Sequence, residues 1–166
     1  LGCLSGATRP DDGSITIAAI DAGAESARRL RLARDQWKLL EPAYRSYQRS
    51  VRPALNALAA ATDPLEDIRA QAGPSPRDLK RVMTRFYKAR PAVASTNPPE
   101  PLAAAHALLQ SAWDLADNAL KLRLRAVETG SPGRSAEASA AAAGALMLAE
   151  RARDDIAQAV KMPALP

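Results

Sequence analysis

Few residues in this sequence could take part in catalysis or hold a metal ion. His106 is the only histidine and Cys3 the only cysteine of the 166 residues, so a zinc site built from several Cys and His ligands is excluded. Nucleophilic catalysis needs a base within hydrogen-bonding reach of the nucleophile, and no such pair is recognisable. His106 shares a helical row with Trp113 and Leu120, which is more typical of a hydrogen-bonded histidine at the edge of the core than of a catalytic base.

Two aspartates, Asp114 and Asp117, lie one helical turn apart. We expect both on the outer face of their helix, with Asp117 paired to Lys121 at i,i+4 spacing, which makes an acid–base pair of carboxylates improbable. The sequence contains no glycine-rich phosphate loop and no nucleophile elbow. It therefore predicts no catalytic residue, no cofactor and no metal site, and a protein that is not an enzyme.

Basic residues show the clearest spacing that could serve binding. Arg31, Lys38, Arg45 and Arg52 recur every seven residues, which on a helix forms a line about 32 Å long at about 1.5 Å per residue. We name these four residues the basic row. They are either the solvated polar face of a bundle helix or a docking edge for an acidic partner.

A second basic segment is predicted over residues 76–89. Ser75 and Pro76 are N-terminal helix signals, and five cations within the segment and Arg90 directly after it accompany the single anion Asp78. Such a helix can bind a membrane surface, a nucleic acid or an acidic protein, or it can be a bundle helix with a charged exterior. Tyr87 lies off the apolar side, which favours an interface. The candidate docking residues here are Arg77, Arg81, Arg85, Tyr87 and Lys88, with Lys80 and Arg90 beside them.

The net charge of +5 lies in the first part of the chain. Residues 1–100 contain 16 Lys and Arg against 11 Asp and Glu, and residues 101–166 contain seven of each. One end of the molecule should therefore prefer anionic partners.

The composition predicts an all-α fold. Apolar residues make up 47% of the chain but aromatic residues only 4%, and the abundance of Ala and Leu favours helix. The strongest pattern covers residues 21–61, where apolar residues occupy the a and d positions of successive heptads, the seam that a bundle helix buries. Pro42 and Pro53 fall off these rows, so we predict kinks on the outer face of one helix and not chain breaks. The rows are Leu30, Trp37, Tyr44, Val51, Leu58 and Ala33, Leu40, Tyr47, Ala54, Ala61.

The predicted architecture is a four-helix-type, up-and-down bundle in a single domain over residues 15–162. After the kinked first helix, turn and cap residues delimit the others, and the proline-rich segment 91–101 reads as an extended crossover connection. Residues 1–14 are predicted to be a flexible tether and residues 163–166 a C-terminal tail. The expected helices are 21–61, 64–72, 76–89, 102–129 and 135–162.

The tripeptide Leu1-Gly2-Cys3 resembles the end of a bacterial lipoprotein signal, in which the cysteine carries the lipid. The resemblance covers three residues, and Leu1 lies two positions before Cys3 where the usual motif has three. It implies a lipid anchor on Cys3 and a periplasmic, membrane-associated domain. The alternative is an ordinary exposed thiol on a cytoplasmic protein. No run of apolar residues is long enough for a membrane-spanning helix.

Together these features predict a non-catalytic accessory subunit. It would dock through basic helix faces onto acidic surfaces of other protein subunits in a larger membrane complex. An energy-transducing complex is one kind of complex that fits this description. The alternative is a module that binds nucleic acid or another anionic surface. We rank it lower because proteins that bind single strands need several stacking aromatic residues, and this chain has only six aromatic residues in total.

Overall fold

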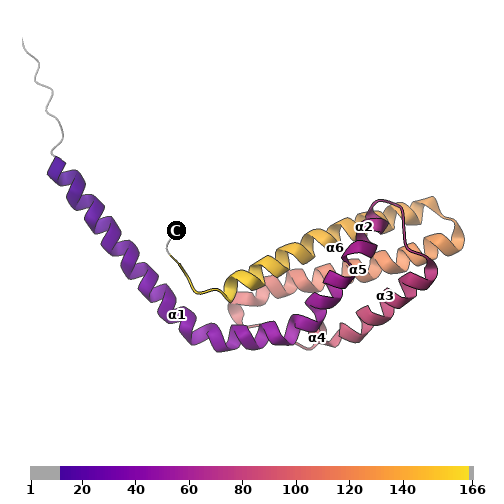
Figure 1. Cartoon of the computed structure of the whole chain (residues 1–166), viewed down its shortest axis with the longest axis horizontal. Helices are drawn as coiled ribbons and strands as arrows, with labels where there is room; N and C mark the ends of the chain where they lie inside the picture. Colours follow the sequence, from indigo (N-terminus) through magenta and orange to yellow (C-terminus); the bar gives the residue numbers. More distant parts are fainter. Residues whose placement is uncertain (1–11, 165–166) are drawn as a thin grey trace, which may run out of the picture. The chain divides into compact units, whose positions relative to one another are not determined.

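The computed structural model describes residues 12–164, with side chains from Ala22 onward. Helices make up the regular structure of this range, and it contains no strand (Figure 1). The prediction of an all-α helical bundle is confirmed. The elements are α1 (Asp12–Ala60), α2 (Thr62–Arg69), α3 (Pro76–Ala89), α4 (Pro91–Ala94), the 3-10 turn η1 (Glu100–Leu102), α5 (Ala103–Thr129) and α6 (Pro132–Ala159).

The chain divides into two compact units. Leu1–Leu40 with Met162–Pro166 form one unit, and Glu41–Lys161 form the other. The range predicted for a single bundle domain, 15–162, spans both. The bundle described below lies in the second unit.

In the first unit, α1 is already helical at Asp12, so the tether predicted for 1–14 is wrong for residues 12–14, and residues 1–11 lie outside the described part. An acidic residue in the first turn and the alanines that follow favour this earlier start. Trp37 is buried, whereas Leu39 is 82% exposed. The Nε of Arg34 donates a hydrogen bond to the carbonyl oxygen of Pro163 at 3.0 Å, which joins the C-terminal segment to α1.

The second unit begins with the remainder of α1. The helix runs through both Pro42 and Pro53, which are exposed, as predicted. Its ribbon changes direction in the C-terminal third, the part that contains Pro53 (Figure 1). The heptad rows are confirmed here as the buried side of α1, by Tyr44, Tyr47, Val51, Ala54, Leu58 and Ala61.

Helices α5 and α6 pack along one another and form the centre of the bundle. Gly130 ends α5 in the left-handed conformation, with φ of 64°, which a residue without Cβ adopts without strain. Small residues line the buried side of α6, so the two backbones can approach closely. The buried alanines of α6 include Ala138, Ala142, Ala145, Ala149 and Ala152.

Helices α2 and α3 cover this pair, α2 against α6 and α3 against α5. The bounds of α3 agree with the prediction. The prediction that α2 covers 64–72 and ends at Gly73 is wrong: α2 ends at Arg69, and Gln71 takes a left-handed φ of 56°. Ser139 of α6 donates a hydrogen bond to the carbonyl oxygen of Arg69 at 2.6 Å, so a tertiary contact caps α2 before the glycine is reached.

The prediction that the proline-rich connection is extended throughout is wrong. The connection contains α4 and η1, because proline is tolerated in the first turn of a helix, where its missing N–H has no intrahelical acceptor. Leu102 belongs to η1, so α5 begins one residue later than predicted.

The last helix is shifted by three residues from its predicted range. α6 begins at Pro132, because Ser131 accepts the capping hydrogen bond from the backbone N–H of Arg134. It ends at Ala159 and not at Met162.

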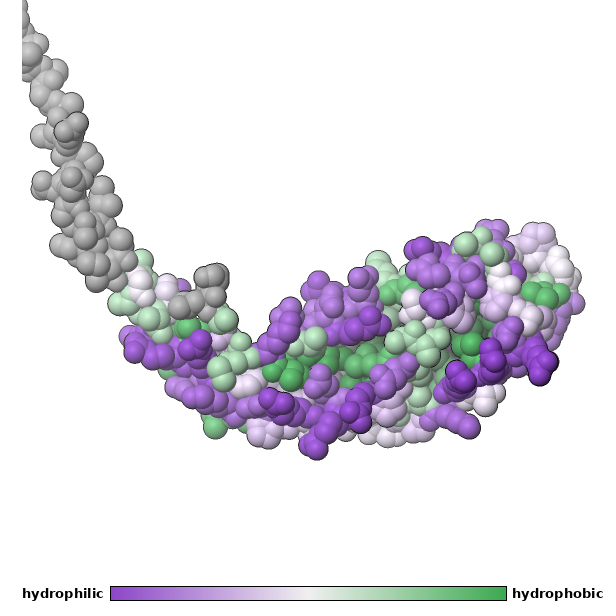
Figure 2. Space-filling model, viewed as in Figure 1, coloured by the Kyte–Doolittle hydropathy of each residue, from purple (hydrophilic) through white to green (hydrophobic). Residues whose placement is uncertain are grey.

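The bundle carries polar residues on its outer faces. Figure 2 shows hydrophobic side chains gathered in the seam between α6 and α1, with hydrophilic residues along both helices. Within the described range, no helix is long and apolar enough to cross a membrane.

Candidate functional site

Helix α3 is held on the bundle by two aromatic or aliphatic anchors. Leu79 and Phe86 are buried, and the ring of Phe86 stacks on that of Trp113 in α5 with centroids 3.6 Å apart and an interplanar angle of 15°. The Oγ of Ser75 accepts a hydrogen bond from the backbone N–H of Asp78 at 3.2 Å. Anchors and cap together fix which side of α3 faces solvent.

The solvent-facing side of α3 is strongly basic. Arg81 pairs with Asp78 at 3.0 Å, and within residues 22–164 none of the other cations of this helix forms an ion pair. Their charges are therefore left to solvent or to a partner. We name the exposed cations of this segment the α3 basic face: Arg77, Lys80, Arg81, Arg85, Lys88 and Arg90.

Tyr87 lies beside this face and is 41% exposed. The Nζ of Lys121 in α5 lies 5.8 Å from the centroid of its ring, within the range of a cation–π contact. The same Nζ donates a hydrogen bond to Oδ2 of Asp117 at 2.6 Å, and this bond is the largest cause that raises the pKa of Lys121. Tyr87 thus connects the α3 basic face to a polar group on α5.

The predicted Asp117–Lys121 pair is present, but the expectation that Asp117 lies on the outer face is wrong. Asp117 is 9% exposed, and its Oδ1 has no hydrogen-bond partner among the described residues. The spacing along the helix explains why Asp117 is buried. It follows Trp113 by four positions and precedes Leu120 by three, which places all three residues on one side of α5.

The basic row on α1 is exposed at all four positions. Its residues divide between the two units, with Arg31 and Lys38 in the first and Arg45 and Arg52 in the second. The Oδ1 of Asp35 lies 3.6 Å from the Nζ of Lys38, and the Oε1 of Glu41 lies 2.6 Å from the Nε of Arg45. Two of the four cations of the basic row are therefore neutralised by carboxylates of the same helix. The α3 basic face is therefore the stronger of the two candidate docking surfaces.

His106 is a buried, hydrogen-bonded core residue, as predicted. Its Nδ1 lies 3.0 Å from the hydroxyl oxygen of Tyr47, with both groups buried, and the two rings meet edge to face. Burial lowers the pKa of His106 and raises the pKa of Tyr47 to about 12. The pair joins α1 to α5 in the core.

No three His, Cys, Asp or Glu side chains of the described part of the chain come together in a way that could hold a metal ion. Cys3, the predicted lipid-anchor residue, lies outside the described residues. Comparisons with protein-family models, with curated proteins and with solved structures find no match to this chain.

Proposed function

We propose that this protein is a non-catalytic interaction subunit that docks onto an acidic protein surface through the α3 basic face. The observation that carries the proposal is the excess of exposed, unpaired cations on one helix. Asp78 is the only anion of α3, and Arg81 already pairs with it.

A solvated helix face that serves solubility alone usually mixes both charge signs. The part of α1 around Lys38 and Arg45 has that mixed character, because Asp35 and Glu41 pair with those cations. The α3 basic face lacks such neutralisation, and Leu79 and Phe86 hold it on the bundle. A preorganised surface of one charge sign raises the rate at which an oppositely charged partner docks.

Charge reversal tests the docking proposal. The variant Arg81→Glu, Arg85→Glu, Lys88→Glu should lose retention on the native complex, measured as the amount of co-purifying protein at several salt concentrations. Losing three surface pairs should cost on the order of 2 kcal/mol, about thirtyfold in Kd, and wild-type retention should fall as salt is raised.

The matched control reverses three exposed cations elsewhere on the bundle: Arg125→Glu, Arg134→Glu and Lys161→Glu. It changes the net charge by the same amount, so it should keep its partners if the α3 basic face is the docking site. Unchanged retention of the α3 variant, or equal loss in the control, would contradict the proposal. Saturable binding of a single-stranded nucleic acid that the α3 variant alone loses would replace the protein partner with the nucleic-acid alternative.

We further propose that the protein works on the extracytoplasmic side of a membrane, anchored by a lipid on Cys3. The support is the resemblance of Leu1-Gly2-Cys3 to a lipoprotein signal. Intact mass spectrometry of protein from native membranes should show a diacyl or triacyl increment on a chain that begins at Cys3, and Cys3→Ser should release the protein into the soluble fraction. An unmodified wild-type chain in the soluble fraction would refute the anchor without touching the α3 docking proposal.

A further inference from the structure

A groove between α1 and α6 brings three arginines together. Arg49 and Arg52 line it from α1 and Arg153 lines it from α6, and its volume is about 390 Å³. All of these residues belong to the Glu41–Lys161 unit. We name it the arginine groove, and the rest of its lining is Gln48, Leu55, Asn56 and Ala59.

No carboxylate lines the arginine groove. Within the described residues, Arg52 and Arg153 form no hydrogen bond or ion pair through their side chains, and the Nε of Arg49 donates only to the carbonyl oxygen of Arg45, at 3.4 Å. Three like charges around one groove favour an anion between them.

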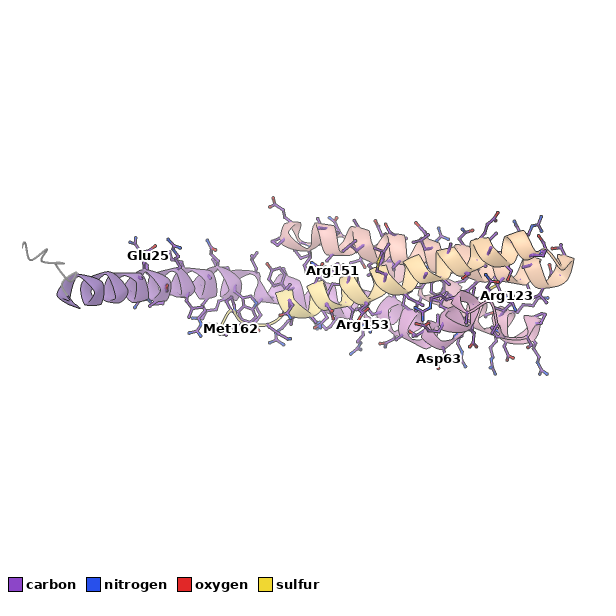
Figure 3. The ribbon with its side chains drawn as sticks, turned by 90° about the horizontal axis from the view of Figure 1, so that it is seen from above. Glu25, Asp63, Arg123, Arg151, Arg153 and Met162 are labelled. Atoms are coloured by element: carbon purple, nitrogen blue, oxygen red, sulfur yellow. The ribbon has the colours of Figure 1, made fainter. Side chains whose placement is uncertain are left out.

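The neighbouring arginines of the same helices behave differently. Arg45 pairs with Glu41 at 2.6 Å, and Arg151 pairs with Asp155 at 3.1 Å. Residues two positions apart on a helix are about 200° apart around its axis, and Figure 3 accordingly shows Arg151 and Arg153 at opposite edges of α6. Arg52 and Arg153, which line the groove, are therefore left without an ion pair, whereas Arg45 and Arg151 beside them each have one.

We propose that the arginine groove binds a phosphate group. A guanidinium presents a planar fork of N–H donors that matches phosphate oxygens two at a time, and the side-chain amides of Gln48 and Asn56 can donate further hydrogen bonds. The site is independent of the α3 basic face, so it adds ligand recognition to the docking proposed above.

The phosphate could belong to a small phosphate ester or to a lipid headgroup. Arg153 also lines a second groove, between α2 and α6, together with Leu146, Met147 and the carboxylate residues Glu66 and Glu150. Met147 is 64% exposed. The chains of a lipid whose headgroup lies in the arginine groove could contact the exposed side chain of Met147 in this second groove, whereas a soluble phosphate ester would make no such contact.

Two probes distinguish these sources: glycerol 3-phosphate and dihexanoyl phosphatidic acid, both titrated into the full chain by calorimetry at constant chloride. We expect saturable binding at one site for both. Tighter binding of phosphatidic acid identifies a lipid headgroup, and equal affinities identify a soluble phosphate ester.

The double variant Arg52→Gln, Arg153→Gln should weaken the binding of both probes by at least about tenfold. The control Arg45→Gln, Arg151→Gln removes the same charge from paired arginines and should bind like the wild type. Arg52→Lys with Arg153→Lys keeps the charge but not the fork geometry, and should give an intermediate loss.

Three results would overturn the proposal. They are the absence of saturable binding by either probe, equal weakening in the control variant, and acetate bound as tightly as glycerol 3-phosphate. Because the substituted side chains are exposed, the variants should keep the circular dichroism and melting temperature of the wild type. The α3 charge-reversal variant should bind both probes normally, which separates this site from the docking surface.

Discussion

Within the described part of the chain, His106, paired with Tyr47, is the one buried side chain whose ordinary pKa lies near neutrality. Both side chains are buried, and their hydrogen bond spans two helices. His106 is the only histidine of the chain, so no other side chain of ordinary pKa titrates between pH 5.5 and 7.5.

Burial lowers the pKa of His106 below its ordinary value of 6.5, so the unfolded chain takes up a proton at a pH where the folded chain still resists it. The free energy of unfolding should therefore be constant above about pH 7 and should fall as the pH drops below about 6.5. Urea unfolding at pH 7.5 and 5.5 measures the difference. In His106→Gln the difference should be much smaller, whatever the absolute stability of that variant. An equal difference in the variant would show that other groups cause it.

At this scale the sequence predicted some side-chain environments and missed others. His106 was placed correctly near the core because its row-mates are apolar. Asp117 was wrongly predicted to be exposed because a charged side chain usually lies in solvent. Its position on the same side of α5 as Trp113 and Leu120 indicates the buried side. The sequence could not predict that Arg153 lines the same groove as Arg49 and Arg52. This depends on which side of α6 faces α1, and no local spacing specifies a contact about 100 residues away along the chain.

Among the elements, α3 is the one whose bounds agree with the sequence prediction, and its cap explains why. The Oγ of Ser75 accepts from the N–H of Asp78 and donates to Oδ2 of the same residue, at 3.2 and 2.8 Å. Both partners of this cap lie within four residues of sequence, so the start of α3 can be predicted from the sequence alone. The end of α2 and the turns within 91–101 depend instead on tertiary contacts such as that of Ser139 with Arg69.

Removing the α3 cap should destabilise the protein measurably. Ser75→Ala should lower the free energy of unfolding by about 1 kcal/mol, since it leaves an N-terminal N–H of the helix without its acceptor. Ser50→Ala is the matched control, because the hydroxyl of Ser50 bonds back to the carbonyl oxygen of Ser46 within α1 and alanine is the better helix former there. Denaturant unfolding of both variants checks this. A loss in Ser50→Ala as large as in Ser75→Ala would contradict the capping argument.

At the scale of the whole molecule, the contact between α5 and α6 is the most extensive of the helix contacts that hold the bundle together. Ala138, Ala142, Ala145 and Ala152 have no exposed surface, so the space between the helices is already filled. The sequence shows alanines repeated along both rows of α6, but it did not specify α5 as the helix on which they pack. It did not predict the division of α1 between two units, because the heptad pattern continues without a break through Leu40.

Enlarging a residue of this contact should separate the helices. Ala145→Leu should lower the free energy of unfolding by about 1–3 kcal/mol or more, because a close-packed interface accepts extra methylene groups only by displacing its neighbours. Ala140→Leu adds the same atoms at an exposed position of α6 and should change it by less than about 0.5 kcal/mol. Thermal and urea unfolding compare the two variants, and equal losses would mean that the contact is not close-packed.

The position of this helix pair in the chain has a consequence for how the protein is made. A ribosome synthesises α1, α2 and α3 before α5 and α6, the helices on which they pack. The buried row of α1, with Tyr44, Tyr47 and Val51, therefore has no surface to cover it until α5 and α6 have left the ribosome. Once both central helices are free, they can pair quickly, because a short turn joins them and their contacts are local. We therefore expect nascent α1 to depend on chaperones, and the bundle to form only after α6 has left the ribosome.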